Sequence, residues 1–317
     1  MRIVVMDDVT LSEEHMQILR SVGELASNTG TPRSREEIIS RAKDAEILIS
    51  GWTHYPEGIF EELPKLQMIA LWATGTDYVN LKEAKQAGIT VTNVPGYSKN
   101  AVAELAFGLM LSVLRKIPQS QQDVKRTRSY NWQLFEGNEL SGKTLGILGT
   151  GAIGAKVARI ARGFEMKVIG YDVYQSQELE NENLLRYVGF DEIFTQSDIV
   201  TVHMPLLADT NGIIALPEFE KMPRHAILIN TARAGLIDQG ALTKCLKKDL
   251  LAGAGLDDLD LDHQTSWELL AMDNVVVTSH IGFYTAEAIQ VKSTRCVHNV
   301  IDFVKSRSAA MPALAKY

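Results

Sequence analysis

The first part of the chain alternates short apolar runs with amphipathic stretches. The run RIVVMD at residues 2–7 is typical of a strand, and residues 12–22 form a helical pattern. Ser12 precedes Glu13 and Glu14, an order typical of a helix N-terminus, because serine caps free N–H groups and the acids oppose the helix dipole. The same patterns predict helices at 34–43 and 80–87, a helical turn at 59–63, and strands at 46–50, 66–71 and 89–94. Strands that alternate with helices predict a parallel sheet with helices on both faces.

Residues 100–117 form a long and strongly apolar helical stretch, and Pro118 marks its expected end. We expect this helix to be buried on most sides between two α/β units. Residues 119–140 are polar, but they contain Trp132 and Phe135. An arm with exposed aromatic side chains often packs against another subunit, so this segment favours a homodimer.

Residues 144–172 carry the most informative pattern of the chain. A short apolar run leads into the glycine motif G-T-G-A-I-G, a helical pattern follows, and a second apolar run ends on Asp172. Gly149 permits a tight turn, Gly151 lets backbone N–H groups approach a pyrophosphate, and Gly154 lets the helix pack closely on the strand. The first turn of the helix attracts the anion with its free N–H groups and its dipole. The pattern therefore predicts a dinucleotide-binding domain.

Asp172 also indicates which dinucleotide binds. It lies at the end of a strand, about 20 residues after the glycine motif, where a carboxylate accepts hydrogen bonds from the adenosine ribose hydroxyls. The same charge would repel the 2′-phosphate of NADP, and Val173, Tyr174 and Gln175 supply no cation to compensate. We therefore expect NAD as the cofactor.

Further apolar runs in the second part of the chain each end in polar residues. They are DIVTVHMP at 198–205, HAILINTAR at 225–233, LLAGAGLDD at 250–258 and NVVVTSHIG at 274–282. Ligands bind outside the carboxyl ends of strands in an open parallel sheet. His203, Arg233 and His280 should therefore lie on the rim that faces the nicotinamide. A last amphipathic helix is predicted at 285–304.

Composition and charge exclude several classes of protein. The 317 residues suffice for two domains, and the formal net charge of −7 argues against nucleic acid or an anionic membrane surface as a partner. No apolar run has the length of a membrane span, and Met1 leads directly into a predicted strand, so we expect no signal peptide. Cys245 and Cys296 are the only cysteines. We expect reduced thiols, no metal site and a cytoplasmic location.

The polar residues of the predicted rim suit a nicotinamide dehydrogenase that acts on 2-hydroxy acids. Arg233 can grip a carboxylate with its planar guanidinium and stays charged. A histidine can exchange a proton with the hydroxyl, because its unperturbed pKa is about 6.5. His203 and His280 compete for this role, and Gly282, which permits close backbone approach, favours His280. The candidates for the acid that would orient the ring are four aspartates after one strand, Asp257, Asp258, Asp260 and Asp262; the alternative is that they form only a solvated charge run.

The chain resembles the D-isomer-specific 2-hydroxyacid dehydrogenases over nearly its whole length. The segments that carry the resemblance are ATGTDYVNL at 73–81, NVPGYSKNAVAELAFGLML at 93–111, GILGTGAIGAKVA at 146–158, VHMPL at 202–206, LINTARAGLID at 228–238, LAGAGLDDLD at 251–260 and VVVTSHIGF at 275–283. The resemblance implies an α/β protein with two domains. A Rossmann-type NAD-binding domain is expected at 100–285, and a flavodoxin-like substrate domain at 1–99 and 286–317. It also implies a homodimer.

The resemblance assigns the family's catalytic arginine to Arg233, its histidine to His280 and its acid to Asp262. The family usually has glutamate at the acid position, so Asp262 is one methylene shorter, and Asp260 is the alternative. The predicted substrate-binding residues are Thr74, Gly75, Thr76, Arg233 and His280. The predicted cofactor-binding residues are Gly149, Gly151, Ala152, Ile153, Gly154, Asp172, His203, Pro205, Thr231, Arg233, Asp257 and His280.

Two loops bear on the substrate, which is expected to be a small 2-keto or 2-hydroxy acid. The family's phosphoglycerate enzymes carry an arginine in the loop that here is 49–53 and contains none. The segments ATGTDY and NVPGYSKNAVAE resemble glycerate dehydrogenases, which reduce hydroxypyruvate and glyoxylate. D-lactate-type and bulkier 2-keto acids stay open. So does a non-catalytic NAD-sensing protein or corepressor on the same fold, although the net charge argues against it.

Overall fold

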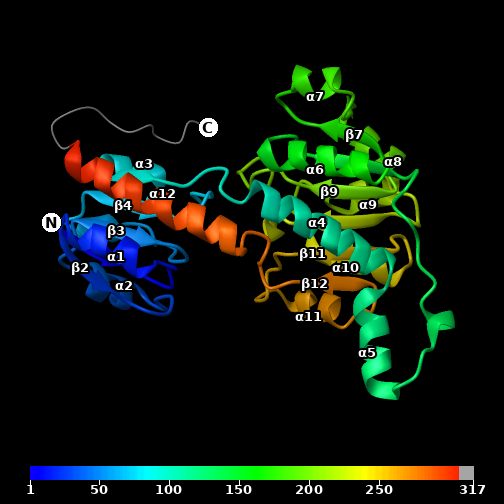
Figure 1. Cartoon of the computed structure of the whole chain (residues 1–317), viewed down its shortest axis with the longest axis horizontal. Coiled ribbons are helices and arrows are strands. Elements are labelled where there is room, and N and C mark those ends of the chain that lie inside the picture. The colour runs from blue at the N-terminus through cyan, green and yellow to red at the C-terminus, as the bar shows by residue number, and fades with distance from the viewer. Residues whose placement is uncertain (307–317) are drawn as a thin grey trace. The chain divides into compact units, whose positions relative to one another are not determined.

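The computed structural model describes residues 1–306 and contains two compact units. The first unit contains residues 1–97 and the segment that begins at Ala286, and the second contains Ser98–Thr285. The division predicted from the sequence was 1–99 with 286–317, and 100–285; of these, residues 307–317 lie outside the described part. In Figure 1 the red helix near the C-terminus lies among the blue and cyan elements of the first unit.

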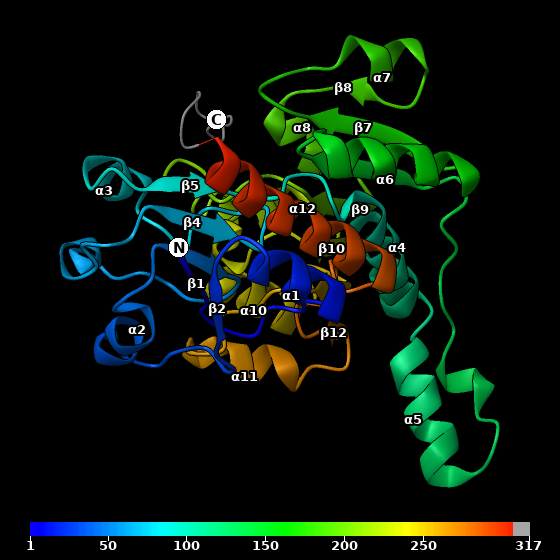
Figure 2. The ribbon, with the colours of Figure 1, turned by 60° about the vertical axis from the view of Figure 1, so that its left-hand side comes forward.

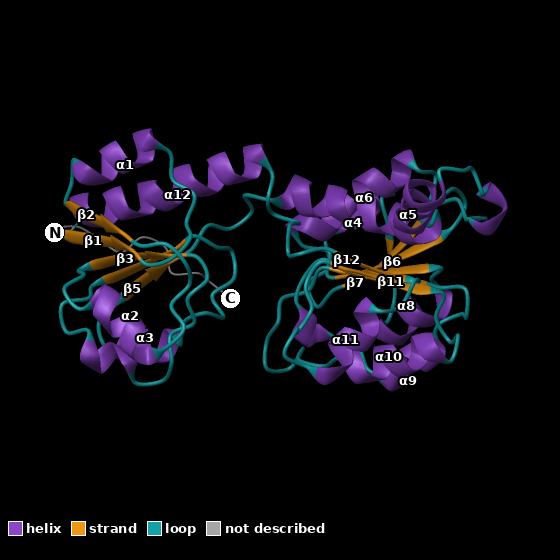
Figure 3. Ribbon diagram, turned by 90° about the horizontal axis from the view of Figure 1, so that it is seen from below, coloured by secondary structure: helices purple, strands orange, loops and turns teal. Residues whose placement is uncertain are grey.

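The first unit is built on a five-stranded parallel sheet with the strand order β2-β1-β3-β4-β5. Its strands are β1 (Arg2–Val5), β2 (Glu24–Ser27), β3 (Ile47–Ser50), β4 (Met68–Leu71) and β5 (Thr90–Thr92). Its helices are α1 (Glu13–Arg20), α2 (Arg35–Ala42), α3 (Leu81–Gln86) and α12 (Ala286–Lys305), with the 3-10 turn η1 (Ile59–Glu62) after β3. Figure 3 shows α1 and α12 on one face of the sheet and α2 and α3 on the other.

Serine side chains begin two helices of the first unit. Ser12 Oγ accepts a hydrogen bond from His15 N–H, and Ser34 Oγ accepts one from Glu37 N–H, both at 3.3 Å. Acidic residues occupy the first turn of both helices. A cap of this kind contributes about 1 kcal/mol of stability. The helix starts predicted from the sequence are therefore confirmed.

The second unit is built on a seven-stranded parallel sheet with the strand order β12-β11-β10-β9-β6-β7-β8. Its strands are β6 (Thr144–Leu148), β7 (Lys167–Tyr171), β8 (Arg186–Tyr187), β9 (Ile199–Val202), β10 (Ile227–Asn230), β11 (Gly253–Leu256) and β12 (Val275–Val277). The chain runs from β6 outward to β8 and then crosses to β9 on the other side of β6. Such a reversal is the point at which open α/β sheets bind ligands. Two parallel α/β sheets confirm the predicted fold class.

Helices cover both faces of this sheet (Figure 3). One face carries α4 (Lys99–Leu114) and α6 (Ala152–Gly163), and the other carries α8 (Phe190–Gln196), α9 (Leu216–Lys221), α10 (Gln239–Lys247) and α11 (Gln264–Leu270). The short helix α7 (Gln177–Asn181) lies at the edge near β7 and β8 (Figure 2), and η3 (Ala234–Leu236) follows β10. Within residues 1–306, no helix has both the length and the apolar character needed to cross a bilayer.

The helix predicted at 100–117 ends earlier than expected. The observed α4 ends at Leu114, Lys116 has a left-handed φ of 51°, and the next helix, α5 (Ile117–Thr127), has Pro118 in its first turn. Proline suits the first turn of a helix because the N–H that it lacks would have no partner there. Pro118 therefore begins a second helix instead of ending the first.

Candidate active site

The glycine motif connects β6 to α6 at the point where the strand order reverses. Gly149 has a left-handed φ of 89°, and a Cβ there would lie 2.8 Å from the backbone of His203. A Cβ on Gly154 would collide with the carbonyl oxygen of Gly149. Only glycine fits either position without a backbone shift. The tight turn and the close packing of helix on strand are therefore both present.

The middle glycine of the motif faces open space. A Cβ on Gly151 would meet no heavy atom within 4 Å, and no side chain caps the first turn of α6, which begins at Ala152. A helix N-terminus of this kind attracts a phosphate group through its N–H groups and its dipole. The motif therefore fits the pyrophosphate of a dinucleotide, which the N–H groups of Ala152 and Ile153 would hold.

Asp172 follows β7, and hydrogen bonds hold its carboxylate beside the glycine motif. Its Oδ2 accepts from Thr150 N–H at 2.7 Å, and its Oδ1 accepts from Tyr174 N–H at 3.0 Å. Val173 and Tyr174 are exposed next to it. A carboxylate in this position can accept hydrogen bonds from ribose hydroxyls and repels a 2′-phosphate.

The ring of His203, one of the two candidate histidines, lies between two threonine hydroxyls. His203 is half-buried, with Nε2 2.9 Å from Thr201 Oγ1 and Nδ1 3.5 Å from Thr231 Oγ1. Burial lowers the pKa of the His203 ring to about 3. A ring that stays neutral near pH 7 is a poor proton donor for a substrate. The His203 N–H donates to Leu148 O at 2.7 Å, one residue before the glycine motif, and Pro205 follows in a turn held by a hydrogen bond from Thr210 Oγ1 to Pro205 O at 2.8 Å.

Arg233 lies in a turn after β10, and the side chain of the buried Asn230 hydrogen-bonds to the backbone of this turn. Asn230 Nδ2 donates to Arg233 O at 2.8 Å, and Asn230 Oδ1 accepts from Ala232 N–H at 2.9 Å. The Arg233 guanidinium is half-buried and donates through Nη1 to Ala232 O at 3.1 Å. These contacts fix the arginine at the carboxyl end of the sheet.

His280 follows β12 in a turn that Asp257 clamps. The buried Asp257 carboxylate accepts hydrogen bonds from Thr278 Oγ1 at 2.6 Å, Ile281 N–H at 2.9 Å and Gly282 N–H at 2.7 Å. His280 itself has a left-handed φ of 56°. Such a conformation costs about 1 kcal/mol or more, so it persists only where the surroundings fix it. Asp257, predicted as a cofactor contact, is here the anchor of the histidine turn.

Asp258 joins the arginine turn to the histidine ring. One of its oxygens lies 3.1 Å from His280 Nδ1, and the other accepts from Ala234 N–H, next to Arg233, at 2.8 Å. Burial alone would raise the pKa of Asp258, but its hydrogen bonds with His280 and Ala234, and the charges of His280 and Arg233, lower it overall. A carboxylate at this distance orients an imidazole and fixes which ring nitrogen carries the proton.

The predicted acid partner of His280 was Asp262, with Asp260 as the alternative, and that assignment stays a prediction beside the observed contact with Asp258. Both aspartates are exposed in a turn after β11, where Asp262 N–H donates to Asp260 Oδ1 at 3.1 Å. His263 N–H closes the same turn on Asp260 O at 3.2 Å. The carboxylate found 3.1 Å from His280 Nδ1 is that of Asp258. Hydrogen bonds within the turn hold the backbone around Asp260 and Asp262.

The predicted substrate loop, Thr74 to Thr76, belongs to the first unit. It follows β4, and two hydrogen bonds fix it there. Thr74 Oγ1 donates to Val94 O at 2.9 Å, and Asn93 Nδ2 donates to Thr74 O at 2.7 Å. Gly75 therefore lies in an anchored loop at the carboxyl end of the five-stranded sheet.

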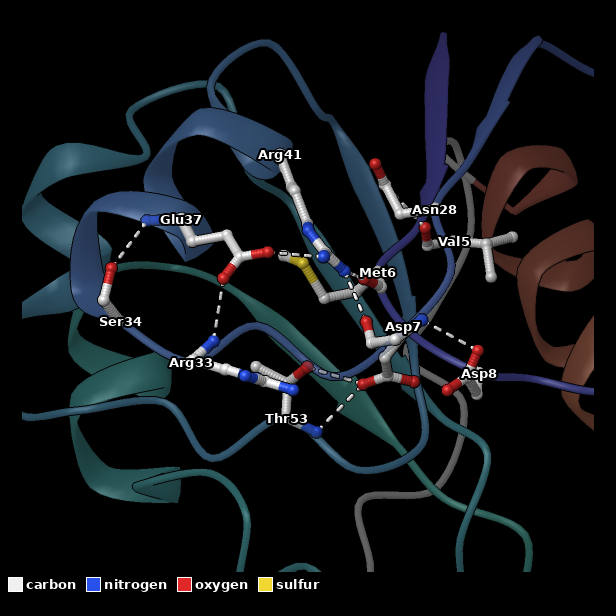
Figure 4. Close-up of polar contacts among 11 residues, drawn as sticks. Val5, Met6, Asp7, Asp8, Asn28, Arg33, Ser34, Glu37, Arg41 and Thr53 are labelled. Carbon is white, nitrogen blue, oxygen red and sulfur yellow. Dashed lines mark hydrogen bonds and ion pairs between the residues drawn. The ribbon is translucent and has the colours of Figure 1, made fainter.

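Asp7 fixes a second loop at the carboxyl end of the same sheet. Its buried carboxylate accepts from the N–H groups of Gly51, Trp52 and Thr53 at 2.8, 3.0 and 2.9 Å. Thr53 Oγ1 also donates to it at 2.5 Å, and Figure 4 shows the Thr53 side chain directed at this carboxylate. The loop therefore has a fixed backbone, and it presents a half-buried tryptophan and no cation.

Comparison with known proteins finds relatives along most of the chain. The family description "D-isomer specific 2-hydroxyacid dehydrogenase, NAD binding domain" matches residues 107–282. A glyoxylate reductase from Thermococcus litoralis is 37% identical over 278 residues, which are 86% of this chain and 84% of that protein. A glycerate dehydrogenase from Methylorubrum extorquens is 36% identical over 288 residues, 88% of each chain. A D-3-phosphoglycerate dehydrogenase from Methanocaldococcus jannaschii is 37% identical over 90% of this chain, which spans 54% of that longer protein.

Solved structures share the fold over nearly the full length. An acyclic imino acid reductase (Bsp5), in complex with NADPH and D-Arg, has a TM-score of 0.88 at 32% identity and covers 97% of this chain and 98% of its own. A D-lactate dehydrogenase from Aquifex aeolicus, complexed with NAD and lactic acid, has a TM-score of 0.86 at 26% identity and covers 96% of each chain. The similarity therefore includes both units.

Proposed function

The chain belongs to the family of D-isomer-specific 2-hydroxyacid dehydrogenases, NAD-dependent oxidoreductases, and we propose that it reduces hydroxypyruvate to D-glycerate and glyoxylate to glycolate. The observation that carries the proposal is the Asp258 carboxylate, which connects the Arg233 turn to the His280 ring. The relatives named glyoxylate reductase and glycerate dehydrogenase, which match more than 80% of their own lengths, support this substrate class.

In the proposed reaction each of these residues has a separate task. The Arg233 guanidinium binds the substrate carboxylate and stabilises the negative charge that develops on the keto oxygen. NADH, when bound, supplies the hydride for the carbonyl carbon. The protonated His280 ring donates its Nε2 proton to the keto oxygen, which completes the alcohol. Asp258 accepts a hydrogen bond from Nδ1–H and so leaves Nε2 for the substrate.

The loops of the first unit support a small substrate. Backbone N–H groups at Thr74, Gly75 and Thr76 would hold the substrate carboxylate, as the family resemblance implies. The loop that Asp7 anchors, at 49–53, lacks the arginine that the family's phosphoglycerate enzymes carry in it, so it supplies no cation for a phosphate. Asp172 would select NAD over NADP.

The test is a panel of 2-keto acids with NADH, followed by nicotinamide absorbance. Hydroxypyruvate and glyoxylate should give values of kcat/KM about tenfold or more above those of pyruvate and 2-ketoisocaproate. Each substrate is also assayed with added ammonium ion. Faster turnover with ammonium would indicate an imino acid as the substrate and would contradict the proposal, as would the absence of NADH oxidation with every member of the panel.

A His280 variant provides the control for this panel. His280→Ala should remove nearly all turnover and leave NADH binding intact, because the ring supplies a proton and the glycine motif holds the cofactor. Turnover that survives in His280→Ala would assign the proton to another group.

We also propose that the protein is a homodimer in the cytoplasm. Tyr130, Trp132 and Leu134, around the turn η2 (Trp132–Leu134), are 88%, 73% and 65% exposed, and exposed apolar groups of this size favour a partner surface. Both cysteines, Cys245 and Cys296, are buried free thiols, a state that a reducing compartment preserves.

A further inference from the structure

A chain of hydrogen bonds connects the edge of the seven-stranded sheet to the glycine motif. The hydroxyl of Tyr187, in the edge strand β8, accepts from Ser176 N–H at 2.9 Å. It lies 2.8 Å from Thr150 Oγ1, which in turn lies 3.3 Å from Asp172 Oδ2. Figure 2 shows β8 beside β7 at this edge. Segments that are far apart in the sequence therefore meet at the Asp172 carboxylate.

The groups at the two ends of this chain fix its direction. A backbone N–H can only donate, and an ionised carboxylate can only accept. Ser176 N–H therefore donates to the Tyr187 oxygen, which leaves the Tyr187 proton for Thr150. The Thr150 proton is then directed to Asp172. Hydrogen bonds that run in one direction polarise and strengthen one another.

Packing holds Thr150 in the orientation that this chain requires. The residue is buried, and a Cβ on Gly170 of β7 would lie 3.0 Å from Thr150 Cγ2. The methyl group therefore occupies the space over Gly170, and the hydroxyl faces Tyr187 and Asp172. Thr150 N–H adds its own hydrogen bond of 2.7 Å to the same carboxylate oxygen.

We propose that Tyr187 is a positioning residue for the choice of cofactor, because its hydroxyl holds Thr150 and the loop 173–176 and so keeps the Asp172 carboxylate at the ribose site. The inference rests on the proposed preference for NAD. Without the hydroxyl, Ser176 N–H loses its acceptor and the Thr150 hydroxyl loses its donor. The loop and the carboxylate can then shift, and a 2′-phosphate meets less repulsion.

The test is the Tyr187→Phe variant of the full-length protein, in which the binding of NADH and of NADPH is titrated. The Kd for NADH should rise about tenfold, as expected when a polar group loses its partner, while the Kd for NADPH changes by less than about threefold. The preference for NADH should therefore fall several-fold. With saturating NADH, kcat should stay within about twofold, because the substitution leaves the substrate site unaltered. The matched control is Tyr171→Phe. The ring centroids of Tyr171 and Phe190 lie 5.2 Å apart, and this substitution should change neither Kd.

Two Thr150 variants test the same chain of hydrogen bonds at the residue between Tyr187 and Asp172. Thr150→Val removes the hydroxyl but keeps the branched shape, so it should reproduce the loss of preference, whereas Thr150→Ser keeps the hydroxyl and should retain it. A Tyr187→Phe variant that keeps the wild-type ratio of the two Kd values, or weakens both equally, would overturn the proposal. A wild-type chain without a preference would overturn it too. Binding is measured without a keto acid, so these outcomes are independent of the proposed substrate.

Discussion

At the scale of single residues, two adjacent aspartates after β11 have different partners. Asp257 is buried and holds the backbone of the turn around His280, whereas Asp258 binds the ring of that histidine. The positions of Arg233 and His280 at the carboxyl ends of β10 and β12 could be predicted, because each follows a strand by three residues. The acid could not be chosen from four nearby aspartates, because the sequence does not show which carboxylate the backbone after β11 directs toward the ring, and Asp258 is the one found beside it. Asp258, close to the end of β11, shared the positional signal that identified the other two.

The Asp258 assignment predicts which aspartate supports keto-acid reduction. Asp258→Asn keeps the shape of the side chain but replaces the carboxylate beside His280 Nδ1 by an amide. The value of kcat/KM should therefore fall about tenfold or more, because the ring loses the charged partner that orients it. Asp262→Asn is the matched control, because its carboxylate is exposed, and it should leave kcat/KM unchanged. The reverse pattern, with only Asp262→Asn lowering kcat/KM, would return the role to Asp262.

At the scale of elements, long patterns were predicted well and short edge elements were not. The helix expected at 285–304 is α12 (Ala286–Lys305), and the apolar runs of the second unit became β9, β10, β11 and β12. The edge strands β2 and β8 were missed, because they are four and two residues long and are not fully buried. Half-exposed residues carry no strong apolar signal, and their pairing depends on the neighbouring strand. Tyr187 of β8, with its contact to Thr150, was therefore invisible in the sequence.

Helix α12 carries a buried lysine that should affect stability. Lys292 is 2% exposed, and its Nζ lies 3.4 Å from the centroid of the Trp72 ring and 5.0 Å from that of Tyr97. Burial lowers the pKa of Lys292 to about 7, although the nearby Asp7 carboxylate acts in the opposite direction. In the unfolded chain a lysine keeps its proton to about pH 10.4. Unfolding between these values therefore takes up a proton, and this group makes the folded state more stable as pH rises from 7 to 10.

Lys292→Met should remove this pH dependence. The unfolding free energy of the variant minus that of the wild type should fall by up to about 1.4 kcal/mol per pH unit between pH 7 and 10, because only the wild type gains stability there. Urea unfolding at several pH values measures the difference. Lys305→Met, an exposed position of the same helix, is the control. If the unfolding free energies of wild type and Lys292→Met change in parallel with pH, Lys292 keeps its proton in the folded state.

At the scale of the whole molecule, the proposed homodimer rests on the arm that follows α4. The two ends of the arm lie side by side, since Asn138 N–H donates to Leu114 O at 3.0 Å. A buried carboxylate stiffens it, because Asp123 accepts from Asn131 Nδ2 at 2.8 Å and from Arg126 Nη2 at 3.1 Å. A pre-organised arm loses little entropy on docking, so its exposed apolar side chains can contribute fully to association.

The proposed role of the arm predicts how substitutions in it should weaken dimer formation. Wild-type protein should have about twice the 35.1 kDa chain mass in light scattering after size exclusion. Replacement of both Trp132 and Leu134 by serine should raise the dimer dissociation constant about a hundredfold, because large apolar side chains at an interface contribute about 2 kcal/mol or more. Trp267→Ser is the matched control, since Trp267 is 68% exposed on α11, outside the arm. A monomeric wild type, or a double variant that dimerises as tightly as the control, would show that the arm has another role.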